Sequence, residues 1–213
     1  MTLQCACSKG HESRRVVLTG GPGAGKTPVL ELVRRSLCQH VKVLPEAASI
    51  IFGGGFPRED AAGGRRAAQR AIYHVQRELE AWADTHRAAV VLCDRGTVDG
   101  LAYWPGTEAE FWASFATTPS AESGRYDTVI HLRTPASSEG YNQANPVRTE
   151  SAADAADIDE RLLHAWKDHP RRFVVPSSID FMDKAATALQ ILKGELPDCC
   201  AGHLPRAHPP DRG

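Results

Sequence analysis

The chain has 213 residues, of which 42% are hydrophobic and 24% are charged, and its formal net charge is −1. This length and this balance suit one α/β domain with a hydrophobic core of its own. The near-neutral charge argues against non-specific binding to DNA or RNA, which normally requires a basic surface, so any phosphate recognition must be local.

The sequence contains no predicted transmembrane segment, because no apolar run reaches the roughly 18–20 residues that span a bilayer. The N-terminal residues, MTLQCACSKGHESRR, lack the long apolar stretch of a secretory signal. A cytoplasmic protein is therefore expected.

Short apolar runs alternate with longer amphipathic stretches, a pattern typical of a parallel sheet flanked by helices. The runs predicted to be strands are RVVLT (15–19), VKVL (41–44), AVVLC (89–93), TVIHL (128–132) and FVVP (173–176). Helices are expected at residues 28–40, 61–87 and 157–167. We predict an α/β three-layer sandwich of the P-loop type, with about five parallel strands and a lid segment.

The longest predicted helix, residues 61–87, carries two stripes of side chains. The apolar stripe, expected to face the core, consists of Ile72, Val75, Leu79 and Trp82, at spacings of three, four and three. The neighbouring stripe is polar and consists of Gln69, Tyr73, Gln76 and Glu80. It has two interpretations, a solvated flank or a wall that faces a substrate. Glycines at 53–55 and 63–64 predict a mobile loop ahead of this helix.

The two ends of the chain differ in composition from the middle. We expect residues 1–13 to be a flexible segment, residues 14–193 to form the domain and residues 194–213 to be a disordered tail. The cysteines are Cys5, Cys7, Cys38, Cys93, Cys199 and Cys200. Because their CxC and CC pairs lack the CxxC spacing of common zinc sites, reduced thiols in loose ends are favoured over a metal site.

The segment GGPGAGKT, residues 20–27, fits the P-loop pattern GxxxxGK(S/T) and lies between a predicted strand and a predicted helix. The residues predicted to hold a nucleotide are Gly20, Gly21, Pro22, Gly23, Ala24, Gly25, Lys26 and Thr27. Glycines let backbone N–H groups converge on an anion, and the helix N-terminus adds a positive dipole end. Lys26 is expected to reach the β- and γ-phosphates and Thr27 to ligate Mg²⁺. These residues do not read the base; ATP is the expected nucleotide if the protein is a kinase, with GTP possible. Pro28 removes one donor near the phosphates, at a position where proline is tolerated.

Two acids and an arginine follow predicted strands at the same edge of the sheet. Asp94 directly follows the predicted strand 89–93, at the place where P-loop folds put a ligand of Mg²⁺ or of its water; the alternative is a turn cap. Arg95 is suited to neutralising phosphate charge or holding an acceptor. Glu46 follows the strand 41–44 and can accept the proton of an attacking hydroxyl; the alternative is an exposed salt bridge.

The polar stretch 134–145 has no periodicity and is followed by NPVRTE (145–150). Arg148 in this segment is expected to fold over the nucleotide as a lid; the alternative is an ordinary exposed arginine. Tyr73 is a candidate to stack on an aromatic acceptor, although aromatic residues more often pack in the core.

Five segments, in order, resemble the small AAA-type P-loop domains related to nucleoside and nucleotide kinases. They are GGPGAGKT, LPEAA (44–48), LCDRGTVDGLAYW (92–104), NPVRTE and DERLLHAWKDHP (159–170). This group includes the nicotinamide riboside kinase domains of bacterial NAD regulators and animal GTP- and phosphoinositide-binding proteins. The guanine-reading NKxD sequence of regulatory GTPases is absent from the chain.

The resemblance implies a role for each matching residue. Lys26 and Thr27 would serve the nucleotide and Mg²⁺. Glu46 and Asp94 would lie beside the metal and the acceptor hydroxyl. The acceptor side would comprise Gln69, Gln76, Arg95 and Asp99, and the lid would contain Arg148. Tyr73 is a further candidate to bind the acceptor, on the strength of its own aromatic side chain.

Together these features predict a small-molecule kinase that transfers a γ-phosphoryl group to a nucleoside-like or other hydroxyl or phosphate acceptor. The alternative is a nucleotide-dependent switch, whose partner is a protein or a phosphoinositide. The sequence predicts neither the acceptor nor the oligomeric state.

Overall fold

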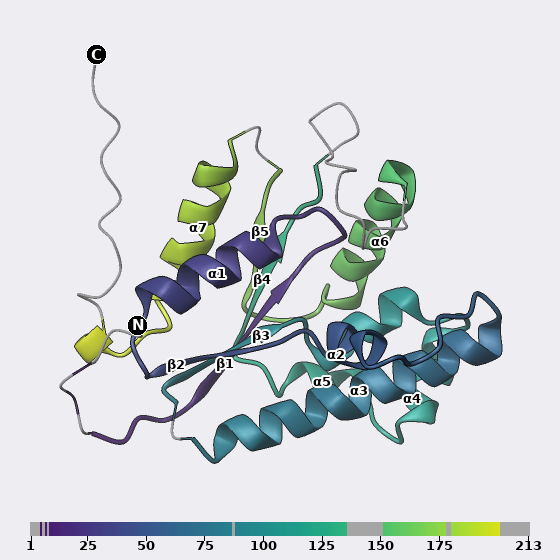
Figure 1. Ribbon diagram of the computed structural model, residues 1–213, viewed down its shortest axis with the longest axis horizontal. Helices are drawn as coiled ribbons and strands as arrows, with labels where there is room; N and C mark the ends of the chain where they lie inside the picture. Colours follow the sequence, from purple (N-terminus) through teal and green to yellow (C-terminus); the bar gives the residue numbers. More distant parts are fainter. Residues whose placement is uncertain are drawn as a thin grey trace.

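A computed structural model describes residues 5, 7, 9–86, 88–135, 151–177 and 180–200. Its centre is a parallel sheet of five strands in the order β2-β3-β1-β4-β5 (Figure 1). The strands are β1 (Arg14–Thr19), β2 (Val41–Leu44), β3 (Val90–Asp94), β4 (Thr128–Leu132) and β5 (Arg172–Val175). The predicted α/β sandwich and all its predicted strands are confirmed. The central strands β1, β3 and β4 are buried apolar runs, as is typical of a parallel sheet covered on both faces, whereas the edge strands β2 and β5 are more exposed.

Helices cover both faces of the sheet (Figure 1). One face carries α1 (Lys26–Ser36) and α7 (Phe181–Lys193), and the other carries α3 (Ala62–Asp84) and α4 (Glu108–Ser114). The remaining elements are α2 (Ala47–Gly53), α5 (Pro119–Ser123), α6 (Ala152–Ala165) and the 3₁₀ helices η1 (Thr97–Tyr103) and η3 (Asp198–Cys200). None of the described helices is both long and apolar enough to cross a membrane.

The central strand β1 contributes to two hydrophobic cores, because successive side chains of a strand point to opposite faces. Val16 and Leu18 pack in the cluster that α1 and α7 close, whereas Val17 packs in the cluster that α3, η1 and α4 close. All three side chains are buried. With β3 on one side of β1 and β4 on the other, the ends of these three strands form one edge, above which the site lies.

Several helices depart from the prediction. The predicted helix 28–40 begins at Lys26, two residues earlier, and ends at Ser36. The short elements α2, η1, α4 and α5 were not predicted, because none is long enough to show a helical period. Nor was α7, although it spans 13 residues. The expected mobile loop is shorter than predicted, because Gly53 closes α2 and Gly63 and Gly64 lie in the first turn of α3.

The C-terminal segment expected to be disordered from residue 194 contains packed residues. Glu195 is buried, accepts a hydrogen bond from Thr128 at 2.8 Å and forms ion pairs with Arg14 and Arg171. Cys200 is also buried. The ordered domain therefore extends to residue 200 at least.

Candidate active site

The phosphate loop requires glycine where it passes the sheet. Gly20 has a φ of 137°, and a Cβ there would lie 2.1 Å from the carbonyl oxygen of Leu132. Gly25, the N-cap of α1, has a φ of 92°. Both angles lie in a region that glycine adopts without penalty. Because α1 starts at Lys26, Pro28 lies in the first helical turn, where its missing N–H breaks no intrahelical bond.

A buried carboxylate, Asp159 of α6, holds the loop from the side. Its Oδ1 accepts hydrogen bonds from the Gly21 N–H and His131 Nε2, both at 2.9 Å. Its Oδ2 accepts from the Thr134 N–H at 3.2 Å and pairs with Arg133 Nε at 2.9 Å. Burial opposes its ionisation, but the hydrogen bonds from His131 and Gly21 outweigh burial and lower the pKa of Asp159. Sequence reasoning gave Asp159 no role, although it begins the segment DERLLHAWKDHP.

The ammonium group of Lys26 contacts the backbone at the start of the phosphate loop. Its Nζ donates to the carbonyl oxygens of Gly20 at 2.7 Å and Gly21 at 3.0 Å. Burial, followed by the nearby charge of Arg95, lowers the pKa of Lys26 to about 7. A bound polyphosphate supplies the opposite charge that favours the ammonium form.

Asp94 lies at the end of β3, paired in register with Leu18 of β1. Its Oδ1 is buried and has no hydrogen-bond partner in the described part of the chain. Burial raises the pKa of Asp94 to about 6, and the charge of Lys26 partly offsets this. A buried carboxylate oxygen without a partner fits a site for Mg²⁺ or its water, and the exposed Thr27 lines the same cleft.

Glu46 and Arg95 form an ion pair between the ends of β2 and β3, with Arg95 Nε 2.6 Å from Glu46 Oε1. Ser49 donates to Glu46 Oε2 at 2.5 Å, and Arg95 Nη1 donates to the Gly20 carbonyl at 3.3 Å. Although burial opposes ionisation, the charge of Arg95 and the Ser49 hydrogen bond lower the pKa of Glu46 to about 2. Arg95 has a φ of 74°, a left-handed conformation uncommon for residues other than glycine, and such strain concentrates at functional sites.

A cleft of about 460 Å³ extends from the phosphate loop between α2, α3 and η1. It brings together the predicted residues Lys26, Thr27, Glu46, Gln69, Tyr73, Gln76, Asp94, Arg95 and Asp99. Its lining also includes Phe52, Arg58 and Arg65, which sequence reasoning missed, since α2 and the segment after it were not predicted. Arg148 lies outside the described residues.

Asp99 lines the cleft but is only 2% exposed. Its side chain is buried and accepts hydrogen bonds from the Gly96 N–H at 2.6 Å, from Trp166 Nε1 at 3.1 Å and from the Thr19 hydroxyl. Both carboxylate oxygens are thus engaged by the protein itself. The geometry makes Asp99 a residue that positions the turn after Arg95.

The polar stripe of α3 is more deeply buried than its apolar stripe, of which Ile72, Val75 and Leu79 are only partly buried. Tyr73, Gln76 and Glu80 are buried, whereas Trp82 of the apolar stripe is 46% exposed. Neither open interpretation, solvated flank or substrate wall, describes the whole polar stripe. It packs inward because distant residues provide its partners.

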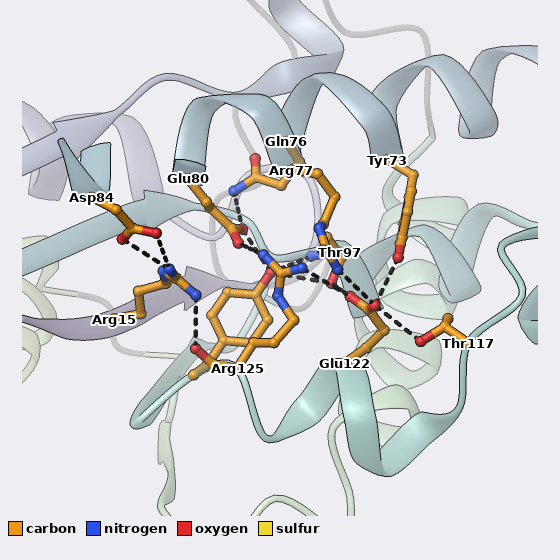
Figure 2. A network of polar contacts seen from close by, with 11 residues as sticks. Arg15, Tyr73, Gln76, Arg77, Glu80, Asp84, Thr97, Thr117, Glu122 and Arg125 are labelled. Atoms are coloured by element: carbon orange, nitrogen blue, oxygen red, sulfur yellow. Dashed lines mark hydrogen bonds and ion pairs between the residues drawn. The ribbon is translucent and has the colours of Figure 1, made fainter. Parts of the chain in front are cut away.

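Figure 2 shows these partners, on the segments between β3 and β4. Tyr73 donates to Glu122 Oε1 at 2.7 Å, and Gln76 donates to Glu80 Oε1 at 2.8 Å. Arg125 pairs with Glu80, and Thr97 donates to Glu122 Oε2 at 2.7 Å. Tyr73 and Gln76 therefore line the floor of the cleft with their polar ends turned toward this network.

A second, more open hollow of about 610 Å³ lies on the other side of the phosphate loop. Its lining comes from the ends of β4 and β5 and from α6, and includes Arg133, Thr134, Asp159 and Pro176. The Thr134 hydroxyl donates to the Pro22 carbonyl at 3.3 Å, which joins this hollow to the loop. The phosphate loop thus lies between the cleft beside α2 and α3 and this second hollow beside α6.

A thymidylate kinase from Candida albicans has a similar structure, with a TM-score of 0.59 and 12% identity over 88% of this chain and 96% of that one. A thymidylate kinase from Ehrlichia chaffeensis has a TM-score of 0.57 and 13% identity over 84% and 98% of the two chains. The fold is therefore that of a P-loop nucleotide kinase.

A search of curated protein sequences found none that matches this chain. A family model described as an AAA domain matches residues 15–184, which include the phosphate loop, Glu46, Asp94 and Asp159. The chain therefore belongs to this family of AAA-type P-loop domains.

Proposed function

We propose that the protein is a small-molecule kinase that transfers the γ-phosphoryl group of a magnesium-bound nucleoside triphosphate to a nucleoside-like acceptor. The observation that carries this proposal is the cleft beyond the phosphate loop, with Lys26, Asp94, Glu46 and Arg95 on one wall. A protein that only binds or hydrolyses a nucleotide has no need of a cleft of about 460 Å³ that extends from its phosphate loop to α2 and α3.

The nucleotide phosphates bind at residues 20–27, where backbone N–H groups and the N-terminus of α1 favour an anion. ATP is the expected nucleotide, and GTP is the alternative. The open hollow beside Thr134 and Pro176 is the space we assign to the base, since it lies across the loop from the acceptor cleft. We also retain Arg148 as the arginine of a lid.

Thr27 and Asp94 are the residues that would hold Mg²⁺, Asp94 directly or through a water. When bound, the ion neutralises charge on the β- and γ-phosphates. Two cationic side chains in the lining of the cleft would act together with this ion. Lys26 lies at the phosphate loop, and Arg95 lies toward the proposed acceptor. Catalysis by such a set is mostly positioning and charge neutralisation.

For a hydroxyl acceptor, the acceptor oxygen attacks the γ-phosphorus while the bond from that phosphorus to the β,γ-bridging oxygen breaks. The nucleoside diphosphate leaves, and the hydroxyl proton passes to Glu46. A carboxylate with a pKa of about 2 is a weak base, so Arg95 must first turn from Glu46 toward the incoming phosphates. A phosphate acceptor has no such proton at neutral pH, and Glu46 then serves to orient Arg95.

The test is a screen of nucleosides, nucleoside monophosphates, sugars and phosphoinositides for acceptor-dependent release of ADP or GDP. With a hydroxyl acceptor, Glu46→Gln is expected to lower turnover by about 10²–10⁴-fold, the range of general base catalysis, and to spare nucleotide affinity. With a phosphate acceptor the loss is smaller. Glu31→Gln is the matched control, because Glu31 lies on α1 and outside the cleft.

Turnover that no acceptor stimulates would reject the kinase assignment. If, in addition, binding to a protein or a phosphoinositide differs between the di- and triphosphate states, the protein is a nucleotide-dependent switch.

A further inference from the structure

Five of the six cysteines gather with two histidines at one end of the molecule. The cluster consists of Cys5, Cys7, His11, Cys38, His40, Cys199 and Cys200. These residues come from the N-terminal segment, the turn between α1 and β2, and η3. In Figure 1 the yellow η3 lies near the C-terminal end of α1 and the start of β2. His40 precedes the first residue of β2, so the cluster lies at the opposite edge of the sheet from the phosphate loop.

The donor atoms are spaced as they would be around one small cation. His40 Nδ1 lies 3.2 Å from Cys200 Sγ and 3.9 Å from Cys199 Sγ, and the two sulfurs are 3.7 Å apart. Donor atoms of these residues and of Cys5 all lie within 4.8 Å of one another. Tetrahedral Zn²⁺, with Zn–S near 2.3 Å and Zn–N near 2.05 Å, separates its ligands by about 3.5 Å for S to N and about 3.8 Å for S to S.

We propose that Cys5, His40, Cys199 and Cys200 bind one structural Zn²⁺ ion. Three thiolates and an imidazole are a donor set that structural zinc sites use, and four protein ligands close the coordination sphere. His40 presents Nδ1 to the site, so its proton lies on Nε2. His40 and Cys200 are buried, which shields the metal–ligand bonds from solvent.

The other members of the cluster surround these ligands. Cys38 Sγ lies 3.3 Å from Cys200 Sγ and 3.6 Å from His40 Nδ1. His11 Nε2 lies 3.4 Å from Cys199 Sγ and 3.5 Å from Cys7 Sγ. Hydrogen-bonding groups next to metal-bound sulfur orient the ligands and adjust the charge on them.

The zinc site would tie three distant parts of the chain together. Cys5 and Cys199 are 194 positions apart, and Cys5 Sγ already lies 3.5 Å from the Cys199 carbonyl. A metal bridge across so long a loop removes much conformational freedom from the unfolded chain. The local CxC and CC spacings concealed this site, because no two of the proposed ligands except Cys199 and Cys200 come from the same segment.

The site is tested on the full chain, purified under reducing conditions without chelators, by elemental analysis and by Co²⁺ substitution. We expect about one zinc ion per chain and, with Co²⁺, visible bands of a tetrahedral ion with near-ultraviolet thiolate charge transfer. Cys199→Ser, Cys200→Ser and His40→Ala should lose zinc. Cys93→Ser is the matched control and should keep it, because Cys93 lies inside β3, away from the cluster.

Cys5→Ser changes a ligand that lies outside the sheet and its helices, so this variant is the one most expected to fold. Retained nucleotide affinity would show that it does. It should bind zinc more weakly, and a chelator should lower the melting temperature of the wild type more than that of this variant. A wild-type chain without zinc and without a Co²⁺ charge-transfer band would overturn the proposal. So would zinc retained by a Cys199→Ser/Cys200→Ser variant, or a Cys38–Cys200 disulfide in the reduced preparation. All these readouts are independent of kinase activity.

Discussion

Glu46 and Arg95 follow neighbouring strands, β2 and β3, and their ion pair, with 2.6 Å between Arg95 Nε and Glu46 Oε1, lies in the lining of the cleft beside the phosphate loop. Arg95 also donates to the Gly20 carbonyl, so one guanidinium touches both the loop and the predicted base. In the proposed kinase, an incoming phosphate would compete with Glu46 for this guanidinium. The basicity of Glu46 would then depend on whether a phosphate occupies the site beside Arg95.

Nucleotide binding is expected to take up a proton at Lys26. With a pKa of about 7, most of the free side chain is neutral at pH 8, and bound phosphates favour its charged form. Calorimetry in buffers of different ionisation enthalpy should show an uptake of nearly one proton at pH 8 and little at pH 6. Lys26→Ala should abolish the uptake and weaken affinity by roughly 10–100-fold, the value of a hydrogen bond to a charged group.

Lys167→Ala is the control for this experiment, because Lys167 is exposed and lies outside the cleft. Equal proton uptake by the wild type and the Lys26→Ala variant would show that another group titrates.

Asp94→Asn should stabilise the protein while disabling it. Because folding raises the pKa of Asp94 to about 6, the native state binds more protons than the unfolded state between roughly pH 4 and 6. The free energy of unfolding therefore falls as the pH rises through this window, and the buried charge is unfavourable at pH 8. We expect the melting temperature at pH 8 without Mg²⁺ to rise, and Mg²⁺-dependent turnover to fall by about 10²-fold or more. A lower melting temperature would contradict this account.

Glu122 should be critical for stability, because it joins α3 to the segments between β3 and β4. Its buried carboxylate accepts hydrogen bonds from Tyr73, Thr97 and Thr117 and pairs with Arg77. Glu122→Gln removes the charge and cannot satisfy all these donors, so the free energy of unfolding should fall by about 2–4 kcal/mol. Urea denaturation of the wild type and the variant measures this difference in the free energy of unfolding.

The pairing of Tyr73 with Glu122 is isolated by a double-mutant cycle with Tyr73→Phe. Additive effects of the two substitutions would mean that the 2.7 Å hydrogen bond contributes nothing to stability.

Gly20→Ala should destabilise the protein by more than about 1 kcal/mol and lose nucleotide affinity, because the new Cβ would meet the Leu132 carbonyl and the φ angle is unsuited to alanine. Gly63→Ala is the matched control. Its Cβ would meet no atom within 4 Å in the first turn of α3, so it should stabilise by roughly 0.5–1 kcal/mol. Thermal unfolding and nucleotide titration of both variants test the contrast.

The sequence predicted those features whose signal is local. Each strand is an apolar run, and the phosphate loop, Glu46 and Asp94 follow strands whose carboxyl ends meet at one edge. The burial of the polar stripe of α3 was harder to predict. The buried carboxylate of Glu80 is satisfied by Arg125 and Tyr126, 45 and 46 positions away, as well as by Gln76 on the same helix. Periodicity reports the polarity of a stripe but not whether distant partners will satisfy it.

The contacts of Asp159 and of the cysteine cluster were unpredictable for the same reason, because their partners are distant in sequence. Asp159 follows Gly21 by 138 positions, and Cys5 and Cys199 are 194 apart. Contacts between residues so far apart in sequence can be predicted only when the order of the strands in the sheet is known.

The buried carboxylate of Asp99 has a mechanical consequence. It is bonded at once to the end of β1 through Thr19, to the turn after Arg95 through Gly96, and to the end of α6 through Trp166. A displacement of α6 would therefore be transmitted both to β1, which leads into the phosphate loop, and to the turn that follows Arg95. A single buried side chain thus couples the position of a peripheral helix to the two ends of the cleft.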